Sequence, residues 1–143
     1  MSVPKALIKS LQLVPHPEGG WYRETWRVNS PGGERASATA IYFLLEHGQR
    51  SHWHRVDADE LWLWHAGHPV ALSIADGEHG ETKEIELGSD VLQGQQPQLL
   101  IPAHNWQSAQ ANCGWALVSC VVSPGFNFEG FTLAPPGWTP TPA

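Results

Sequence analysis

Apolar and polar residues alternate every one or two positions along most of the chain, whereas near the N-terminus the apolar residues recur at a helical spacing. There, apolar residues at positions 3, 6, 7, 8, 11 and 13 predict a short amphipathic helix over residues 3–13. Pro15 and Pro17 end this helix, because proline cannot continue a helix interior. The residues that follow, Glu18-Gly19-Gly20, predict a turn.

From residue 21 onward the pattern predicts short strands separated by turns rich in glycine, proline and asparagine. The predicted strands are 21–28, 36–45, 50–55, 60–65, 70–74, 82–87, 98–101, 106–111 and 115–122, with 126–133 as a last candidate. Nine or ten short strands at this spacing predict an all-β sandwich or barrel. Residues 1–143 show no repeat, linker or charge run, so we expect one domain. Its barrel is expected at about 20–133, before a tail at about 135–143 that is mobile or laid on the surface.

The composition supports this fold class and excludes others. The chain has 143 residues, of which 41% are hydrophobic and 15% charged, against roughly 25% charged in an average domain. Glycine (14), proline (12) and tryptophan (8) are frequent. This mixture excludes a coiled coil, a helical bundle rich in Ala, Glu and Lys, and a disordered chain.

The charge balance excludes several classes of partner. Eight Lys and Arg stand against 14 Asp and Glu, which gives a net charge of -6 without a basic cluster. We therefore expect neither nucleic acid nor an anionic membrane surface as a partner. No apolar run approaches the roughly 18 residues of a membrane span, and the N-terminus lacks an apolar signal core, so a cytoplasmic location is expected. Cys113 and Cys120 are expected to be buried free thiols.

The candidate chemistry gathers at residues 52–60. His52 and His54 are two positions apart, so on a strand they are expected to point the same way. Glu60 begins the next predicted strand, and antiparallel pairing brings residues on the two sides of a turn within roughly 5 Å. Two imidazoles and a carboxylate on one wall suit a Zn, Mn, Fe or Ni site, and they equally suit general acid–base chemistry.

The spacing of these residues resembles the first motif of the cupin superfamily: His-x-His, five residues, Glu60, six residues, Gly67. Residues 102–107 stand where the second cupin motif belongs. Gln107 takes the position of the fourth metal ligand, normally His, and His104 takes that of the turn glycine, which His tolerates better than most residues.

A narrower resemblance covers residues 6–134 and is to the DUF985, or cupin_5, family. Its segments are HPEGGWYRETWR (16–27), SATAIYFLL (37–45), HRVDADELWLWHAG (54–67), IPAHNWQSA (101–109) and SCVVSPGFNFEGFTLA (119–134). The resemblance implies an RmlC-like double-stranded β-helix, which is a cupin jelly-roll barrel, usually as a homodimer with a pocket inside. It establishes no general catalytic activity. It also implies that the block holding His16, Glu18, Arg23 and Glu24 lines or closes the pocket.

The resemblance makes a metal site less favoured than a pocket for a small molecule. Gln107 matches a Trp-Gln pair of the family, and a Gln amide oxygen is a weak ligand for Zn or Fe. We therefore expect a small-molecule-binding cupin, without a tightly bound cofactor, that holds a polar ligand such as a sugar or nucleotide. The alternatives are a metal-dependent isomerase, lyase or oxygenase, and a metal-free, epimerase-like acid–base enzyme.

Each hypothesis has its own set of candidate residues. His54 and Glu60 are the acid–base candidates. The metal candidates are His52, His54, Glu60 and Gln107. The ligand-binding candidates are Gln107, Trp62, Trp64, Tyr42, Arg23, Glu18 and Phe126. Trp62 and Trp64 are included because alternation puts them on the same face of the strand as Glu60.

Overall fold

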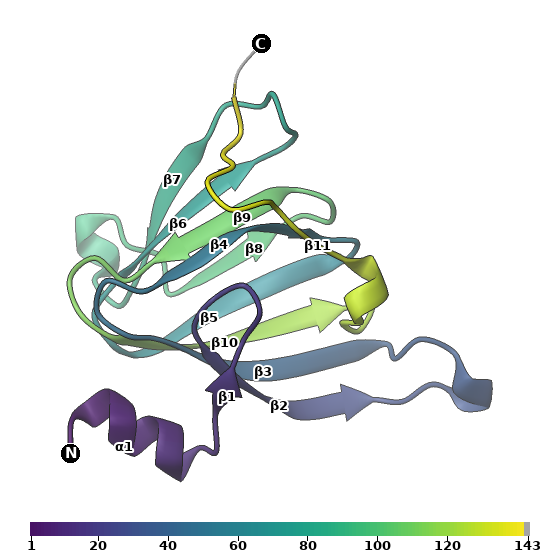
Figure 1. Cartoon of the computed structure of the whole chain (residues 1–143), viewed down its shortest axis with the longest axis horizontal. Helices are drawn as coiled ribbons and strands as arrows, with labels where there is room; N and C mark the ends of the chain where they lie inside the picture. Colours follow the sequence, from purple (N-terminus) through teal and green to yellow (C-terminus); the bar gives the residue numbers. More distant parts are fainter. Residues whose placement is uncertain (142–143) are drawn as a thin grey trace.

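In the computed structural model of the protein, which describes residues 1–141, two antiparallel sheets face each other and one helix stands at the N-terminus (Figure 1). The elements are α1 (Val3–Ser10), β1 (Val14–Pro15), β2 (Trp21–Val28), β3 (Ala38–Leu45), β4 (Arg50–Val56), β5 (Asp59–Gly67), β6 (Val70–Ala75), β7 (Lys83–Leu87), β8 (Gln98–Ile101), β9 (Trp106–Gln110), β10 (Ala116–Ser123) and β11 (Phe131–Leu133). Short 3-10 turns lie at Pro31–Gly33, Val91–Gln93 and Phe128–Gly130. This is the expected all-β class with one short helix.

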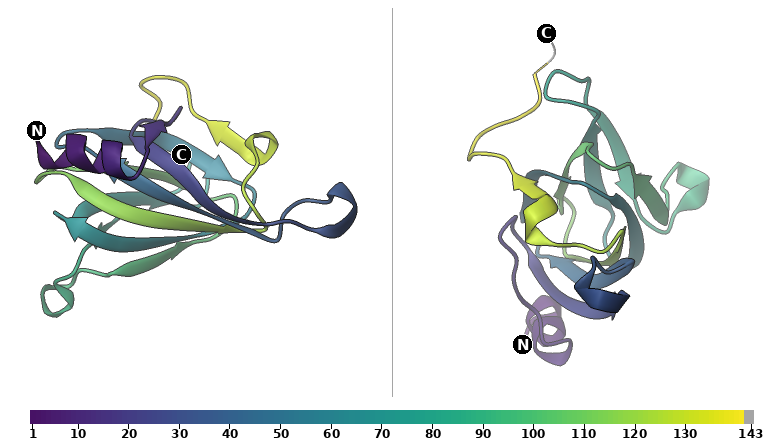
Figure 2. Two further views of the ribbon diagram at one scale, coloured as in Figure 1. Left: turned by 90° about the horizontal axis from the view of Figure 1, so that it is seen from below. Right: turned by 90° about the vertical axis from the view of Figure 1, so that its right-hand side faces the viewer.

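The chain passes repeatedly from one sheet to the other. The six-stranded sheet has the order β1-β2-β3-β10-β5-β8, and the five-stranded sheet has the order β11-β4-β9-β6-β7. The two sheets curve around a common interior, as the two views of Figure 2 show. Because β3, β4 and β5 alternate between the sheets, residues close in sequence reach opposite walls of that interior.

The interior is packed at one end and hollow at the other. Phe43, Leu45 and Trp62 belong to a large apolar cluster that fills the packed end. Along β10 every second residue points inward, since successive side chains of a strand alternate between its two faces. Val118 therefore lies in the packed cluster, whereas Cys120 and Val122 also line a cavity at the hollow end.

A β-bulge in β4 separates two histidines that the sequence places together. The register of β4 against β9 shifts between Ser51 and His54, so the extra residue breaks the alternation of faces. His54 is buried and lines the cavity. The Nε2 atom of His52 instead lies 2.9 Å from the carbonyl oxygen of Pro135. The expectation that both imidazoles point the same way is therefore wrong.

The N-terminal elements differ from the predicted ones in length. The helix begins with a Ser2 side chain that accepts a hydrogen bond from the Lys5 backbone N–H, and it ends at Ser10 rather than at residue 13. Gln12 has a positive φ of 55°, which a right-handed helix does not allow. The chain then forms β1, a two-residue strand paired with Trp21 and Tyr22 of β2.

Likewise, only the last part of the candidate strand 126–133 is extended, because residues 128–130 form a 3-10 turn.

The segment 135–141 lies on the five-stranded sheet. The Trp138 ring is 4.5 Å from the Trp106 ring and 6.4 Å from the Trp53 ring, measured between centroids. The Thr141 backbone N–H donates to the carbonyl of Glu78 at the turn between β6 and β7 (Figure 1). Residues 135–141 therefore contact the sheet and the turn between β6 and β7, and residues 142–143 of the predicted tail lie outside the described part.

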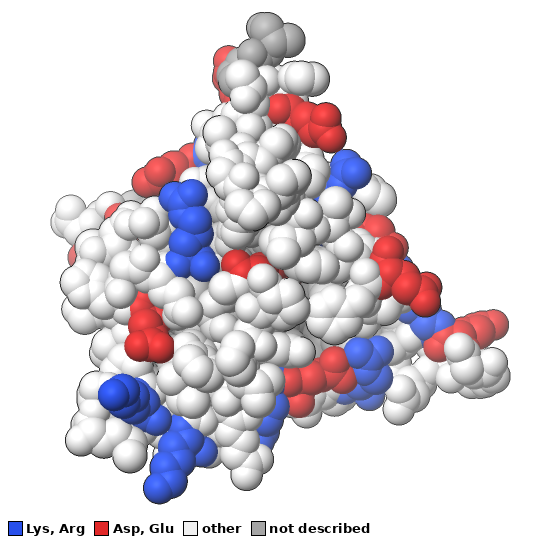
Figure 3. Space-filling view, viewed as in Figure 1, with Lys and Arg blue, Asp and Glu red and all other residues white. Residues whose placement is uncertain are grey.

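The surface seen in Figure 3 carries acidic and basic side chains interspersed, without a broad field of one sign. Across residues 1–141, α1 and the 3-10 turns are all too short to cross a bilayer as helices.

Candidate functional site

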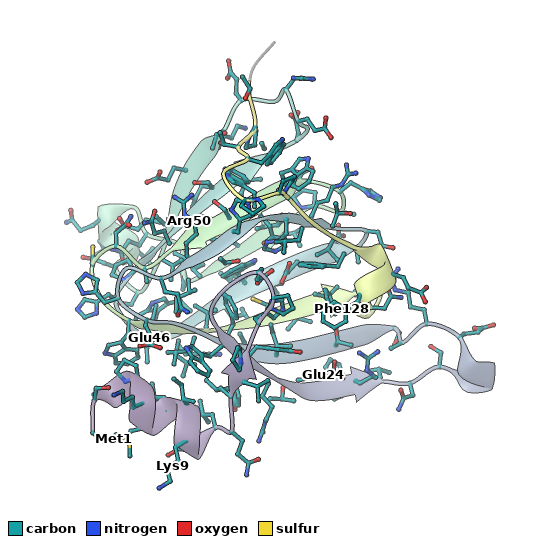
Figure 4. All side chains as sticks on the ribbon, in the orientation of Figure 1. Met1, Lys9, Glu24, Glu46, Arg50 and Phe128 are labelled. Atoms are coloured by element: carbon teal, nitrogen blue, oxygen red, sulfur yellow. The ribbon has the colours of Figure 1, made fainter. Side chains whose placement is uncertain are left out.

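A cavity of about 450 Å³ occupies the hollow end of the barrel. Both sheets, the loop between β1 and β2, and the segment 126–131 contribute to its wall. Two lining residues, Glu24 of β2 and Phe128 of the 3-10 turn before β11, are labelled at the right of Figure 4. The polar and aromatic lining residues include His16, Glu18, Arg23, Glu24, Arg27, His54, Glu60, Cys120, Phe126, Phe128 and Phe131.

Glu18 reaches the cavity on the loop between β1 and β2. The loop is closed by a hydrogen bond from the His16 N–H to the Gly20 carbonyl (2.8 Å). It is attached to β4 by the His52 N–H, which donates to the Glu18 carbonyl (2.7 Å). Gly19 has a φ of +104°, and a Cβ there would collide with the carbonyl oxygen of Arg50. Only glycine lets the loop lie this close to β4.

Glu18 and His54 form a buried pair. The distance from Glu18 Oε2 to His54 Nε2 is 3.0 Å. His54 Nδ1 lies 2.8 Å from the His52 carbonyl oxygen. Because a carbonyl oxygen only accepts, His54 Nδ1 carries a hydrogen and Nε2 of the neutral ring is free to accept one.

Burial decides the charge of this pair. It lowers the pKa of His54 to about 4. Burial, together with the charge of Glu60, raises the pKa of Glu18 well above its ordinary value. Both changes favour neutral groups, since a low-dielectric interior penalises the charged form of each. The pair therefore holds one proton near neutral pH, carried by the Glu18 carboxyl group and donated to His54 Nε2.

Glu60 is held by a separate chain of hydrogen bonds. The Trp62 indole N–H donates to Gln107 Oε1 (2.9 Å), and Gln107 Nε2 donates to Glu60 Oε1 (2.8 Å). Burial raises the pKa of Glu60 to about 7, although the hydrogen bonds from Gln107 and Cys120 oppose the rise. A carboxyl group with this pKa gains and loses a proton readily at neutral pH.

The two proton-holding groups lie on different sheets. His54 belongs to β4 of the five-stranded sheet, and Glu60 belongs to β5 of the six-stranded sheet. Both line the same cavity. The cavity thus offers a neutral acid–base pair from one wall and a carboxyl group poised near pH 7 from the other, which is an arrangement suited to moving protons on a small ligand.

Five of the candidate residues meet in this cavity: Glu18, Arg23, His54, Glu60 and Phe126. Arg23 stands at the rim, where its Nη1 donates to Gln12 Oε1 (3.3 Å).

Four ligand-binding candidates stand outside the lining. Trp62 is fully buried in the packed cluster, and Trp64 packs against that cluster while its indole N–H donates to the His68 carbonyl. Tyr42 follows Ile41, a lining residue, so it points to the opposite face of β3. These three residues therefore belong to the barrel wall or its outer surface and do not line the cavity, contrary to the prediction that they contact a ligand. Gln107 lies behind Glu60 and supports it.

The metal candidates do not assemble into a site. His52 turns away at the bulge, and Gln107 presents its NH₂ group, which cannot ligate a metal, to Glu60. Within residues 1–141, no three His, Cys, Asp or Glu side chains are placed to hold a metal ion. The set His52, His54, Glu60 and Gln107 therefore does not fit a divalent metal.

Sequence reasoning missed some of the cavity wall. Ile41 and Cys120 line it from β3 and β10. Alternation along β10 could have placed Cys120 inward, but it gives no sign that the hollow begins at this residue. Both cysteines are free, as expected, although Cys113 is exposed. Burial raises the pKa of the Cys120 thiol well above its usual range, so it stays protonated and is a weak nucleophile.

Comparison with known proteins supports the resemblance. A family model described as "Cupin superfamily (DUF985)" matches residues 5–134. A hypothetical protein from Leishmania major is 33% identical with a TM-score of 0.81, over 93% of this chain and 88% of that chain. Protein SO0799 from Shewanella oneidensis is 40% identical with a TM-score of 0.85, over 94% and 85%. An uncharacterized protein of Saccharomyces cerevisiae, YML079W, is 27% identical over 89% of this chain and 73% of its own length.

A more distant similarity concerns the fold alone. Oxalate decarboxylase from Bacillus subtilis is 16% identical with a TM-score of 0.63, over 83% of this chain and 29% of that enzyme. Together with the two facing antiparallel sheets, this confirms the predicted cupin β-barrel.

Proposed function

Because the chain belongs to the family described as Cupin superfamily (DUF985), we propose that its barrel cavity binds a small polar molecule and carries out proton transfer on it. The observation that carries the proposal is that two proton-holding groups, the Glu18–His54 pair and Glu60, line one cavity. Perturbed titratable groups gathered in a concave site are a frequent mark of catalysis. The relatives from Leishmania major, Shewanella oneidensis and Saccharomyces cerevisiae carry no named activity, and the similarity to oxalate decarboxylase concerns the fold alone.

The reaction class that fits these groups is a metal-free isomerisation or epimerisation. The Glu60 carboxylate accepts a proton from a C–H or O–H of the ligand. The Glu18–His54 pair donates its one proton to another atom of the ligand, or to the other face of the same atom. One proton enters the protein and one leaves it, so no oxidant or reductant is needed. Exchange with water then returns each group to its starting state.

The shape and lining of the cavity limit the ligand. A volume of about 450 Å³ lies within the range of small-molecule sites, roughly 300–1,000 Å³. Phe126, Phe128 and Phe131 form an aromatic wall with ring centroids 5.0–6.0 Å apart. A ligand with a flat or ring-shaped body against this wall and polar groups toward Glu60 and His54 matches both surfaces. Sugars and nucleotides are the classes to examine first.

The test combines a ligand survey with two variants. Sugars, sugar nucleotides and common metabolites are screened by thermal shift and calorimetry, and each binder is incubated with the protein in D₂O. We expect at least one binder to take up solvent deuterium. His54→Asn and Glu60→Gln should each lower the rate of uptake by roughly 10²-fold or more, with the dissociation constant changed by less than about fivefold.

Tyr42→Phe, on the outer face, is the matched control and should leave both quantities unchanged. The proposal fails if no compound binds, or if a bound compound exchanges equally fast in wild type and in both variants.

We further infer a homodimer in the cytoplasm. The free edge of β2 is covered by only two residues of β1, and Trp26 and Val14 on these strands are each about half exposed. Such an edge with apolar side chains favours association with a second copy. The free thiols support a reducing compartment. Sedimentation equilibrium tests the dimer, and a monomer at micromolar concentration contradicts it.

A further inference from the structure

Trp62 lies outside the cavity lining, yet its indole N–H is the first link of the chain that ends on Glu60. An indole N–H can only donate. Gln107 must therefore turn its oxygen toward Trp62, and its NH₂ group is left to face Glu60. The amide orientation follows from the chemistry of Trp62 and from no property of Gln107 itself.

This orientation determines the role of each carboxyl oxygen of Glu60. Oε1 accepts the Gln107 N–H at 2.8 Å, and a carboxyl oxygen that accepts such a bond is the poorer place for a proton. The proton of neutral Glu60 is thus left to Oε2.

We propose that Trp62 is a positioning residue for Glu60: acting through Gln107, it fixes which carboxyl oxygen exchanges its proton and stabilises the carboxylate form. The catalytic consequence rests on the proposed function, whereas the effect on Glu60 itself does not.

The other groups around Glu60 cannot take over this task. The Cys120 thiol of β10 donates weakly, and the carboxyl group of Glu18 on the β1–β2 loop is protonated and engaged with His54. His54 of β4 is engaged with Glu18 and the His52 carbonyl. Gln107 of β9 is the member of this group that does not titrate, and it can either donate to Glu60 or accept from it. Which of the two it does depends on Trp62.

Removing the indole N–H should reverse the amide. With Trp62→Phe, Gln107 Oε1 would be buried without a donor, which is costly for a polar atom. A rotated amide lets its oxygen accept a hydrogen bond from the protonated Glu60 carboxyl group, and its NH₂ group then faces the Phe ring, which accepts an N–H weakly. Hydrogen bonding to the neutral form raises the pKa of a carboxyl group. Trp62→Phe is therefore expected to raise the pKa of Glu60 above about 7.

The experiment measures the ionisation of Glu60 by infrared titration of the carboxyl band, assigned by difference with Glu60→Gln and Glu18→Gln. The variants are Trp62→Phe, Gln107→Met and the double variant. Each single variant should raise the midpoint by about one pH unit or more, and the double variant should match Gln107→Met, because Trp62 acts only through Gln107. Phe43→Leu is the control, since Phe43 packs edge-on against the Trp62 ring at 5.9 Å and makes no bond to Gln107.

Two results overturn the proposal: a midpoint of Glu60 in Trp62→Phe within about 0.3 pH units of that in Phe43→Leu, or a further shift of the midpoint when Trp62→Phe is added to Gln107→Met.

A second measurement keeps Trp62 in place and covers the case in which Trp62→Phe does not fold. The NMR signal of the Trp62 indole N–H should move with the midpoint of Glu60, because linked hydrogen bonds polarise one another, and it should not do so in Gln107→Met. A Trp62 indole N–H signal that does not shift as Glu60 titrates contradicts the proposal. None of these readouts requires turnover, so the proposal can stand if the protein proves not to be an enzyme.

Discussion

At the residue scale, the chemistry rests on two carboxyl groups whose pKa burial raises and on an imidazole that burial keeps neutral. Glu18 and His54 would form an ordinary ion pair in water. Inside the barrel they share one proton, because both charged forms lose their hydration. Glu60 has a pKa of about 7 for the same reason. Burial therefore reduces the charge that Glu18, His54 and Glu60 carry inside the cavity.

Some of these site residues can be predicted from the sequence, and others cannot. His54 and Glu60 could be selected because their spacing matches a motif, and Glu18 because its block resembles a family segment. Nothing in the sequence shows that Glu18 and His54 meet, since 35 residues of chain separate them. Strand alternation predicts Trp62 as a stacking surface, but its ring fills the core and its N–H supports Glu60 through Gln107.

The first prediction concerns Glu60 and pH. Between pH 4.5 and about 7 the folded protein keeps a proton on Glu60 that the unfolded chain releases, so this group contributes less stability as pH rises. Glu60→Gln has no such proton. The free energy of unfolding of wild type should therefore fall relative to that of Glu60→Gln by about 3 kcal/mol over this range, which is 2.5 pK units at 1.36 kcal/mol each.

Urea unfolding at a series of pH values measures this difference. Glu84→Gln, on the exposed part of β7, is the control for the loss of a surface carboxyl group. A difference between wild type and Glu60→Gln that does not change with pH would show that Glu60 titrates normally.

At the element scale, the site depends on two interruptions of regular structure: the bulge in β4 and the loop between β1 and β2. The bulge sends His54 inward and His52 outward. Strand alternation predicted the strands well, but it assumes an unbroken two-residue period. A bulge leaves no clear sign in one sequence, so the orientation of His52 could not be read from it.

The second prediction concerns the loop. Gly19→Ala should destabilise the fold by about 1–3 kcal/mol, because the added Cβ meets the Arg50 carbonyl and the φ of +104° is strained for alanine. It should also displace the loop and expose His54 to water, which returns the pKa of His54 toward its ordinary value because burial is what lowers it. Gly32→Ala is the matched control, with a positive φ of 70° and no atom within 4 Å of the added Cβ. Chemical unfolding and histidine NMR titration distinguish them, and equal effects in the two variants would refute a special role for the loop.

The third prediction concerns the segment 135–141. Trp138→Ala should lower the free energy of unfolding by about 2 kcal/mol, less than for a fully buried tryptophan, because Trp138 is half buried against Trp53 and Trp106. This face is outside the cavity, so the pKa of Glu60 should not change. If thermal and urea unfolding of Trp138→Ala match wild type, the segment does not stabilise the sheet.

At the scale of the whole molecule, one end of the barrel interior stabilises the fold and the other end forms the candidate site. The packed end holds Phe43, Leu45 and Trp62, and the hollow end holds the titratable groups. The sequence predicted the all-β class, the cupin barrel and most strands, because apolar alternation and motif order depend on the whole chain. It could not predict where packing ends and the cavity begins. That boundary depends on which side chains from different strands meet.

The most direct test of this account is the protonation state of His54, read from imidazole ¹⁵N signals between about pH 5 and pH 8 and assigned with His54→Asn. We predict a neutral ring throughout this range, with the hydrogen on Nδ1 and Nε2 accepting from Glu18, because burial lowers the pKa of His54 to about 4. A titration midpoint near the ordinary value of about 6.5, or an imidazolium signal at pH 7, would contradict the shared proton and the acid–base function built on it.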